Sequence, residues 1–515
     1  MEKNSLIPRD YQSKILETCL EKDCLVVLPT GTGKTLIALL LAKRIFQKAP
    51  LTKILILAPT RPLIEQHYEY FKKNLPEGFA DMQIFTGKTE SQKRREIWKT
   101  AEFIFSTPQC IANDLENNLY ALDEVSLLIV DECHRCLKNY AYNRVLQKYK
   151  EQNQDGARRK VLGLTASPGS DKETIARVCE NLGIEAVEIR TRESPDVKPY
   201  LQELEFEKIE VAFPQELEEI RIILTEIYNK KIQELKNRKV LFGYASKTAL
   251  LALQSRLMKE ILRGKDFNKM LAVSVLAQAI KLSHALELLE TQTISSFTSY
   301  LKDLYNQAQA QKSKGVQKLV KDPLFSKAYT LATTLLNEHP KINELKRIVT
   351  EQLEKNSDSK IIVFAQYRET VLKISETLKE IKGAKVENFV GQAIKEHQSG
   401  KISGLNQKEQ KKVVENFKEG KVNILVATSI AEEGLDIPEV NQVIFYEPIP
   451  SAIRTIQRAG RTARLAPGSL KILMTKNTRD IAHHYASHHK EVRMHKAIDQ
   501  IKEEFNSGDK QEKLT

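Results

Sequence analysis

The chain has 515 residues, of which 41% are hydrophobic and 29% are charged. This balance is typical of a folded protein and excludes a disordered or fibrous chain. The length corresponds to roughly three domains. Lys and Arg outnumber Asp and Glu by 80 to 67, and the net charge of +13 favours a polyanionic partner. The six scattered cysteines and the lack of an uninterrupted apolar run of ~18 residues predict a cytoplasmic protein with no targeting signal and no membrane span.

Short apolar runs alternate with amphipathic helical segments in two parts of the chain. Such runs are typical of strands that are buried on both faces of a parallel sheet. In the first part we expect strands at 24–28, 53–58, 103–106, 127–130 and 161–164. In the second part we expect them at 360–365, 385–389, 423–427, 442–446 and 470–474. The pattern therefore predicts two α/β domains, each built on a doubly wound parallel sheet.

Between these two parts, strand-like runs are missing and helical periodicity dominates. The sequence therefore predicts an α/β domain over 1–204, an all-helical insert over 205–336, a second α/β domain over 337–505 and a disordered tail over 506–515. The insert also contains a run of lysines, for which a solvated face and a DNA contact are equally good interpretations: Lys312, Lys314, Lys318 and Lys321.

The first expected strand leads directly into the sequence PTGTGKT, and a helix follows. This is the pattern of a phosphate-binding loop, in which Gly31 and Gly33 let backbone N–H groups turn toward phosphate oxygens. Lys34 would reach the β- and γ-phosphates of ATP, and Thr35 would hold Mg²⁺. The general pattern has Gly where this chain has Leu28. The residues of the loop are Pro29, Thr30, Gly31, Thr32, Gly33, Lys34 and Thr35.

The strand expected at 127–130 ends in two adjacent carboxylates. Asp131 is suited to hold Mg²⁺ through its water shell, and Glu132 to orient and deprotonate an attacking water. Cys133 and Cys136 follow as a C-x-x-C pair, but no second pair completes a zinc site, so we interpret them as incidental.

A third pattern, QRAGRTAR, occupies 457–464. Arg461 and Arg464 are spaced three residues apart, so a helix would present both on one face. Such a pair is suited to stabilise charge on a γ-phosphoryl group. Because the phosphate loop lies more than 400 positions earlier, this role requires the two α/β domains to face each other across a cleft.

Together and in this order, these motifs resemble those of the superfamily 2 helicases. The resemblance implies RecA-like motor domains that use ATP and Mg²⁺. It also implies that Arg9 and Gln12 read adenine, that Gly434 and Asp436 contact ATP, and that Gln457 joins Arg461 and Arg464 in catalysis. The residues that would contact nucleic acid are Thr60, Arg61, Thr86, Gly87, Thr107, Tyr367 and Thr428.

A finer resemblance is to archaeal Hef and its eukaryotic relative FANCM. It is carried by NYAY at 139–142, SPDVKPY at 194–200 and HALELLETQ at 284–292. In that family the helical insert is likened to a polymerase thumb. The resemblance implies a DNA helicase or translocase with 3′→5′ tracking that remodels forks and Holliday junctions in replication-fork repair.

Three departures keep other interpretations open. The second motif reads DECH, as in Dicer and the innate-immune sensors of double-stranded RNA, and Ala463 stands where Gly is usual. Hef often carries a C-terminal nuclease, which we do not expect in this sequence. The alternatives are therefore an ATPase or RNA helicase of the Dicer type that responds to RNA duplex, and a nucleic-acid-dependent ATPase that binds without unwinding.

Overall fold

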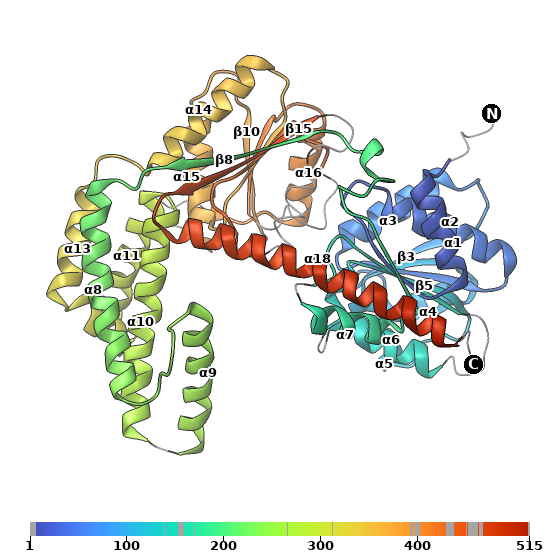
Figure 1. The fold of residues 1–515 in the computed structure, drawn as a ribbon, viewed down its shortest axis with the longest axis horizontal. Helices are drawn as coiled ribbons and strands as arrows, with labels where there is room; N and C mark the ends of the chain where they lie inside the picture. The colour runs from blue at the N-terminus through green and yellow to red at the C-terminus, as the bar shows by residue number, and fades with distance from the viewer. Residues whose placement is uncertain are drawn as a thin grey trace.

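A computed structural model of the chain contains two α/β domains and a helical bundle (Figure 1). Helix α18 (Arg479–Glu512) runs across both α/β domains. The structure describes residues 7–137, 140–152, 159–169, 171–264, 266–311, 313–391, 395–396, 402–428, 437–449, 451, 462 and 467–512.

The strands form two large parallel sheets and one small hairpin. In the first sheet the order is β3-β4-β2-β5-β6-β1-β7, and in the second it is β10-β13-β9-β14-β15-β8. The strands are β1 (Cys24–Val27), β2 (Lys53–Leu57), β3 (Met82–Phe85), β4 (Phe103–Ser106), β5 (Val125–Asp131), β6 (Lys160–Thr165), β7 (Ala186–Ile189), β8 (Leu204–Val211), β9 (Ile361–Phe364), β10 (Val386–Phe389), β11 (Lys395–Glu396), β12 (Ile402–Ser403), β13 (Ile424–Ala427), β14 (Gln442–Phe445) and β15 (Gly468–Thr475).

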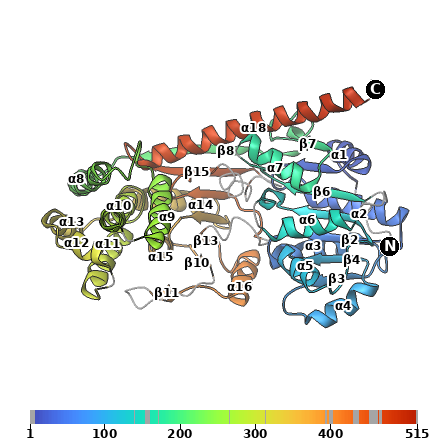
Figure 2. The ribbon, with the colours of Figure 1, turned by 90° about the horizontal axis from the view of Figure 1, so that it is seen from below.

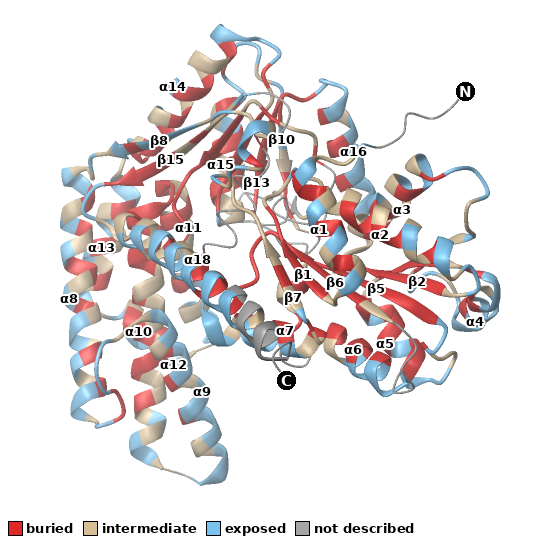
Figure 3. Cartoon of the chain, turned by 45° about the vertical axis from the view of Figure 1, so that its right-hand side comes forward, coloured by how far each residue is buried: buried red, intermediate tan, exposed pale blue. Residues whose placement is uncertain are grey.

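Helices cover both faces of each sheet, as the alternating pattern predicts. In β1, Leu25 and Val27 join the core on one face, while Cys24 and Val26 join the core on the other. The central strands are therefore buried on both sides (Figure 3). The remaining α-helices of the described chain are α1 (Asp10–Glu21), α2 (Lys34–Lys48), α3 (Arg61–Asn74), α4 (Ser91–Thr100), α5 (Pro108–Glu116), α6 (Ala141–Glu151), α7 (Lys172–Leu182), α8 (Gln215–Asn237), α9 (Lys247–Arg263), α10 (Phe267–Thr291), α11 (Ile294–Gln309), α12 (Lys314–Val320), α13 (Pro323–Thr334), α14 (Pro340–Lys355), α15 (Arg368–Leu378) and α16 (Gln407–Lys418).

Strand β8 corrects the expected start of the insert at 205. It pairs in parallel with β15 along its whole length, from Leu204 beside Gly468 to Val211 beside Thr475. The second α/β domain thus takes its edge strand from the chain before the insert. β8 is an edge strand and is only half-buried, so its sequence LEFEKIEV alternates apolar and polar residues. It therefore lacks the continuous apolar run that is typical of a fully buried strand.

The insert is a bundle of α8 to α13 around the central helix α10. By length and composition α10 is apolar enough to cross a membrane, although polar residues such as Gln278 and Lys281 interrupt its apolar run. Burial in the bundle accounts for this composition, since Leu282, Leu286 and Leu289 pack with α8 and α11 in one apolar core. The helix serves as the core of the insert.

Helix α18 begins at the edge of the second domain and ends on the first (Figures 1 and 2). Met494, Ile498 and Ile501 are buried in the same apolar core as α7 and β7 of the first domain. The predicted disordered tail at 506–515 was wrong for residues up to Glu512, because the helix continues to that point. α18 therefore connects the two α/β domains directly.

A buried polar joint fixes the insert to the second domain. The Lys341 Nζ lies 2.5 Å from the Asp480 Oδ2, and both side chains are fully buried. The same ammonium donates to the carbonyl oxygens of Thr291, at 2.9 Å, and Tyr446, at 3.2 Å. Because Thr291 ends α10 and Asp480 lies in the first turn of α18, one ammonium ties the insert, the second sheet and α18 together.

Candidate active site and nucleic-acid interface

The phosphate-site and nucleic-acid residues predicted in the first domain occupy two halves of one sheet edge. All neighbouring strands of the first sheet pair in parallel, so their carboxyl ends meet at the same edge. The phosphate loop, the DECH segment and the segment after Thr165 follow the adjacent strands β1, β5 and β6. The segments of Thr60, Thr86 and Thr107 follow the adjacent strands β2, β3 and β4. This edge is where open α/β sheets bind ligands.

The phosphate loop is tied by its own polar groups. The Thr32 hydroxyl donates to the Pro29 carbonyl at 2.7 Å, and the Lys34 Nζ donates to the Leu28 carbonyl at 2.9 Å. Gly33 has φ of +88°, and a Cβ there would lie 2.3 Å from the Gln12 Nε2, so only glycine fits this position. The other loop residues lie in the turn between β1 and α2 or in the first turn of α2: Pro29, Thr30, Gly31 and Thr35.

Gln12 and Arg9 lie beside this loop with two tyrosines that the sequence analysis did not select. The Gln12 Nε2 and the Tyr11 hydroxyl both donate to the Thr32 carbonyl, at 2.9 and 2.6 Å. The Arg9 guanidinium stacks 4.9 Å above the ring of Tyr200, which arrives from the SPDVKPY segment. The arrangement forms an aromatic and hydrogen-bonding platform next to the phosphate loop, in which the rings of Tyr11 and Tyr200 are tilted by 57° to each other. Tyr11 could have been found from its place between the two selected residues.

Asp131, at the end of β5, is buried and held by an unpredicted histidine. The His67 Nε2 lies 2.8 Å from the Asp131 Oδ2, and the Glu132 N–H donates to Oδ1 at 3.0 Å. Burial alone would raise the pKa of Asp131, but the hydrogen bond and charge of His67, together with the nearby charge of Lys34, keep this pKa below its ordinary value. Asp131 is therefore ionised at neutral pH.

Glu132 begins a chain of polar contacts that leads to α18. Its carboxylate lies 3.3 Å from the His134 Nδ1, which also lies 3.2 Å from the Thr165 hydroxyl. Thr165 accepts from the Ser167 N–H at 3.1 Å, and the Ser167 hydroxyl donates to the Met494 sulfur. The DECH segment and the end of β6 are thus connected to the helix that arrives from the second domain.

A cavity of about 500 Å³ lies between the two α/β domains beside the phosphate loop. It adjoins the phosphate site and does not contain Lys34, Asp131 or Glu132. Apolar side chains from both sheets and α18 dominate its walls. Its lining includes Pro29, Thr30, Ala166, Phe445, Ile472 and Met494.

The second domain's share of the predicted ATP site lies outside the described residues. This applies to Gln457, Arg461, Arg464, Gly434 and Asp436. Thr462, within the QRAGRTAR motif, is described. It is buried, and its hydroxyl donates to the Val440 carbonyl at 2.6 Å, beside β14 of the second domain.

The first nucleic-acid candidates lie where the two α/β domains meet. Thr60 precedes α3 and Arg61 begins it, with the Arg61 Nε donating to the Glu65 Oε1 at 2.8 Å. The other oxygen of Glu65 pairs with Lys411 on α16 of the second domain. Burial would raise the pKa of Glu65, but the two cations outweigh it and lower this pKa. Sequence reasoning missed Glu65 and Lys411, because only the fold brings them together.

A neighbouring loop carries Thr86 and the exposed Gly87. The Arg94 Nη1 donates to the Thr86 carbonyl at 3.3 Å, and Asp114 holds the Arg94 Nε at 2.7 Å. Thr107 directly precedes α5 and is half-buried. The three predicted residues therefore share the sheet edge with Thr60, and a buried ion pair supports the loop of Thr86 and Gly87.

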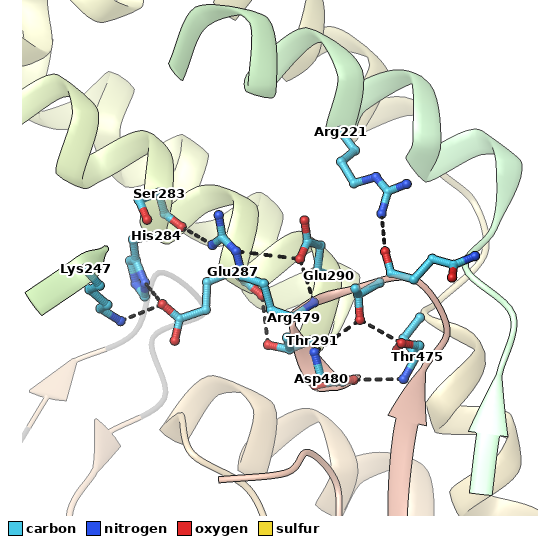
Figure 4. Close-up of polar contacts among 12 residues, drawn as sticks. Arg221, Lys247, Ser283, His284, Glu287, Glu290, Thr291, Thr475, Arg479 and Asp480 are labelled. Atoms are coloured by element: carbon cyan, nitrogen blue, oxygen red, sulfur yellow. Dashed lines mark hydrogen bonds and ion pairs between the residues drawn. The ribbon is translucent and has the colours of Figure 1, made fainter. Parts of the chain in front are cut away.

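In the second domain, the structure places Tyr367 against the insert. Its hydroxyl donates to the Glu287 Oε1 at 3.1 Å. Lys247 pairs with the other oxygen of Glu287, as Figure 4 shows. Burial, followed by the charge of Glu287, raises the pKa of Tyr367. A contact of this hydroxyl with nucleic acid would compete with Glu287. Thr428 follows β13 and is buried, and its N–H donates to the Phe389 carbonyl at 3.1 Å.

Three known family models match successive parts of the chain. A DEAD/DEAH box helicase domain matches 9–175, and a helicase conserved C-terminal domain matches 340–466. A helical bundle, provisionally named after an ATP-dependent RNA helicase, matches 216–339. With the fold and the phosphate-loop and DECH segments, these matches show that the chain is a superfamily 2 helicase, an ATP-hydrolysing enzyme that acts on nucleic acid.

The particular branch of the superfamily follows from a similarity that extends over almost the whole of this chain. The crystal structure of the Pyrococcus furiosus Hef helicase domain is 42% identical, with a TM-score of 0.69, and the match covers 93% of this chain and 98% of that one. The chain therefore belongs to the Hef family.

Two curated relatives are longer than this chain. A Methanocaldococcus jannaschii protein, provisionally named ATP-dependent RNA helicase MJ1505, is 40% identical over 96% of this chain and 61% of its own length. The Drosophila melanogaster DEAD-box ATP-dependent DNA helicase Fancm is 30% identical over 92% of this chain and 33% of its own length. The chain thus spans less than two thirds of either relative.

Proposed function

We propose that the protein is a 3′→5′ DNA helicase or translocase that remodels forks and Holliday junctions in replication-fork repair. The observation that carries this proposal is the division of one sheet edge between a phosphate-binding half and a half suited to contact a strand. Movement of either half affects the other because both are built on the same rigid sheet. The name of the fly relative supports DNA as the substrate, and the Hef relationship supports branched DNA.

In the proposed ATP site, Lys34 and the N–H groups of the phosphate loop bind the phosphates. Thr35 and the ionised Asp131 offer hard oxygen ligands that fit Mg²⁺. When bound, this ion would neutralise charge on the phosphates. Glu132 orients the attacking water and accepts its proton, and Arg461 with Arg464 stabilises the γ-phosphoryl charge from the second domain.

Adenine would be recognised at the platform of Arg9 and Gln12. The Gln12 side-chain amide already contacts the Thr32 carbonyl, so a base that engages Gln12 would also affect the phosphate loop. Tyr200 supplies an aromatic face at the same place, stacked with Arg9. The platform therefore connects nucleotide recognition with the conformation of the loop that holds the phosphates.

Movement on a strand would follow from alternate closure and opening of the two motor domains. Thr60, Arg61, Thr86, Gly87 and Thr107 would hold backbone phosphates from the first domain, and Thr428 with Tyr367 from the second. Phosphate contacts carry no sequence information, so binding would be independent of sequence and strongly dependent on salt.

A second candidate is an RNA-duplex-stimulated ATPase. The DECH segment and the name of the archaeal relative favour it. The two candidates share the ATP site and differ in the nucleic acid that the strand-contacting half and the insert accept. A nucleic-acid-dependent ATPase that binds without unwinding differs from both in producing no strand displacement.

The proposal is tested by strand displacement on labelled DNA. Partial duplexes with only a 3′ or only a 5′ single-stranded tail, and a three-way fork, are incubated with ATP. We expect displacement from the 3′-tailed duplex and remodelling of the fork. Glu132→Gln serves as the matched control, because it should lose ATP turnover while binding DNA normally. Displacement from the 5′-tailed duplex alone, or none from any DNA, would contradict the proposal.

A further inference from the structure

Strand β8 is the last strand of the second sheet, and only one of its two sides is paired (Figure 1). The Glu203 carbonyl accepts from the Gly468 N–H at 3.0 Å, and the Val211 carbonyl accepts from the Lys476 N–H at 2.9 Å. Backbone groups alternate in direction along a strand, so the odd-numbered residues bond with β15 and the even-numbered ones point away from the sheet. The described part of the chain offers no hydrogen-bond partner to the backbone of these outward residues, which are Leu204, Phe206, Lys208 and Glu210.

The outward side of β8 is accessible to solvent. Phe206 is 47% exposed, and Lys208 and Glu210 are exposed as well. β8 spans eight residues, whereas many native edge strands are kept very short so that no further strand can pair with them. Backbone groups at such an edge bond with water, which another strand can replace. The open side of β8 is therefore a template for one more strand.

An apolar cavity lies beside this open side. The cavity of about 500 Å³ between the two α/β domains is lined by Leu204 and Phe206 of β8 and by Leu470 and Ile472 of β15. Leu204 and Phe206 thus direct their backbone groups to the open side and their side chains to the cavity. A strand added beside β8 would present every second side chain to the same cavity. Apolar residues at those positions would fill a space with apolar walls.

The opposite face of β8 is acidic. Glu203, Glu205 and Glu207 alternate with the residues at the cavity, so their side chains lie on the other face of the strand. Glu207 pairs with Lys471, whereas Glu203 and Glu205 are exposed and form no ion pair within the described residues. Residues 203–210 contain four Glu and one Lys, a net charge of −3 in a chain of +13. Basic residues on this face of an added strand would form favourable cross-strand pairs.

We propose that the open side of β8 binds, as an added β-strand, an extended segment of a partner protein in which basic residues alternate with apolar ones. The outward backbone groups of β8 would bond with the backbone of the segment, and the glutamates and the cavity would select its two sets of side chains. A second copy of this chain is a poor occupant, because two β8 strands would bring their glutamates together. The inference concerns a protein partner and does not depend on the nucleic acid proposed above.

Fluorescence anisotropy of the full chain with a designed peptide tests the proposal. The probe is a fluorescein-labelled peptide in which Lys alternates with Val, and its control carries a methyl group on every backbone amide. The control should bind at least about ten-fold more weakly, because methylation removes the backbone donors and leaves every charge in place. Equal affinity for the two peptides would overturn the inference, since it would show an electrostatic contact alone. Failure of the probe to bind would also overturn it.

Two variants at one position separate backbone pairing from charge. Lys208→Pro removes an outward N–H that the ladder with β15 does not use, so the fold should be kept. It should bind the probe at least about five-fold more weakly than Lys208→Ala, which loses the same cation and keeps the N–H. Equal affinity of the two variants would overturn the inference.

A charge variant keeps the proposal testable if Lys208→Pro does not fold. Glu203→Lys/Glu205→Lys changes two exposed side chains and leaves the backbone of β8 intact. It should weaken binding of the probe and strengthen binding of a peptide that has Glu in place of Lys. Unchanged affinity for both peptides would contradict the proposed orientation of the segment.

Hydrogen exchange shows where the probe binds. The amides of Phe206 and Lys208 should exchange fast in the free chain and slowly in the complex, whereas the amide of Glu207 faces β15 and should be protected in both. Protection that leaves out Phe206 and Lys208 would overturn the inference. Self-association of the free chain that Lys208→Pro abolishes would also overturn it and would identify a second copy as the occupant.

Discussion

The imidazole of His67 lies 2.8 Å from the carboxylate of Asp131, and this contact joins the two halves of the functional sheet edge. His67 lies on α3, the helix that begins with the proposed strand contact Arg61. Asp131 ends β5 and is the proposed ligand of Mg²⁺. A strand that displaces the start of α3 would therefore act on the ATP site through a single hydrogen bond.

His67→Ala should lower the kcat of nucleic-acid-stimulated ATP hydrolysis by about ten-fold or more, as is common when a residue that positions a metal-binding carboxylate is lost. DNA affinity should change little, because His67 is buried away from the strand. Steady-state kinetics at several Mg²⁺ concentrations measure the effect, and His67→Gln, which keeps a hydrogen-bond donor, should retain more activity. A wild-type kcat in the alanine variant would mean that His67 only fills space.

Glu65 neutralises one cation from each motor domain, Arg61 and Lys411. Bound phosphates would replace Glu65 as the partner of Arg61 and Lys411. Glu65→Ala should therefore strengthen DNA binding, whereas Arg61→Ala should weaken it on all sequences and reduce the salt slope by about one. Anisotropy titrations from low to high salt provide the measurement. An unchanged salt slope in Arg61→Ala would place the strand elsewhere.

Two carboxylates of α10 should respond to pH in opposite directions. Burial would raise the pKa of Glu287, but His284 and Lys247 outweigh it and lower this pKa to about 2. Burial raises the pKa of Glu290 despite the nearby Arg479. A carboxylate whose pKa is lowered by folding stabilises the fold at pH values above its unfolded pKa of 4.5. This contribution is lost as the pH falls toward 2.

Glu287→Gln should thus lose up to about 3 kcal/mol of stability at pH 7 and progressively less below pH ~4.5. Glu290→Gln is the matched variant three residues away. Folding disfavours the ionised form of Glu290, so Glu290→Gln should be neutral or stabilising at pH 7, and this advantage should vanish in acid. Thermal melts across this pH range give both profiles. Parallel profiles for the two variants would show that the network in Figure 4 does not set these pKa values.

Helix α18 should depend on its buried contacts with the first domain. Met494 is 1% exposed, so Met494→Ala should cost about 2–5 kcal/mol of packing. Val492→Ala, at a site 39% exposed on the same helix, should cost far less. Hydrogen exchange in the second half of α18 reports the loss locally. Equal protection in the two variants would show that this half of the helix is held by other contacts.

The sequence was sufficient to predict the nine central strands of the two sheets, which are mostly apolar runs, and the edge strand β10. It failed for the edge strands β3, β7 and β8 and for the hairpin strands β11 and β12. Edge strands are half-exposed, so their composition is mixed and their boundaries carry no clear signal. The missed β8 also shifted the expected start of the insert, since an alternating strand beside helices resembles part of a helical segment.

The phosphate loop and the carboxylates of DECH could be found because local spacing determines their chemistry. His67, Glu65 and Lys411 could not, since their roles depend on partners 64 and 346 positions away in the chain. Tyr367 was selected by resemblance, and only the fold reveals its bond with Glu287. Interactions between distant segments are the part of the site that spacing alone does not encode.

The most direct test of the account is steady-state ATPase activity at fixed salt with forked DNA, single-stranded DNA, linear duplex DNA and duplex RNA, each added separately. Lys34→Ala supplies the blank. The account predicts the strongest stimulation by forked DNA and none in the blank. Strongest stimulation by duplex RNA would contradict the branched-DNA function and favour the RNA-responsive alternative.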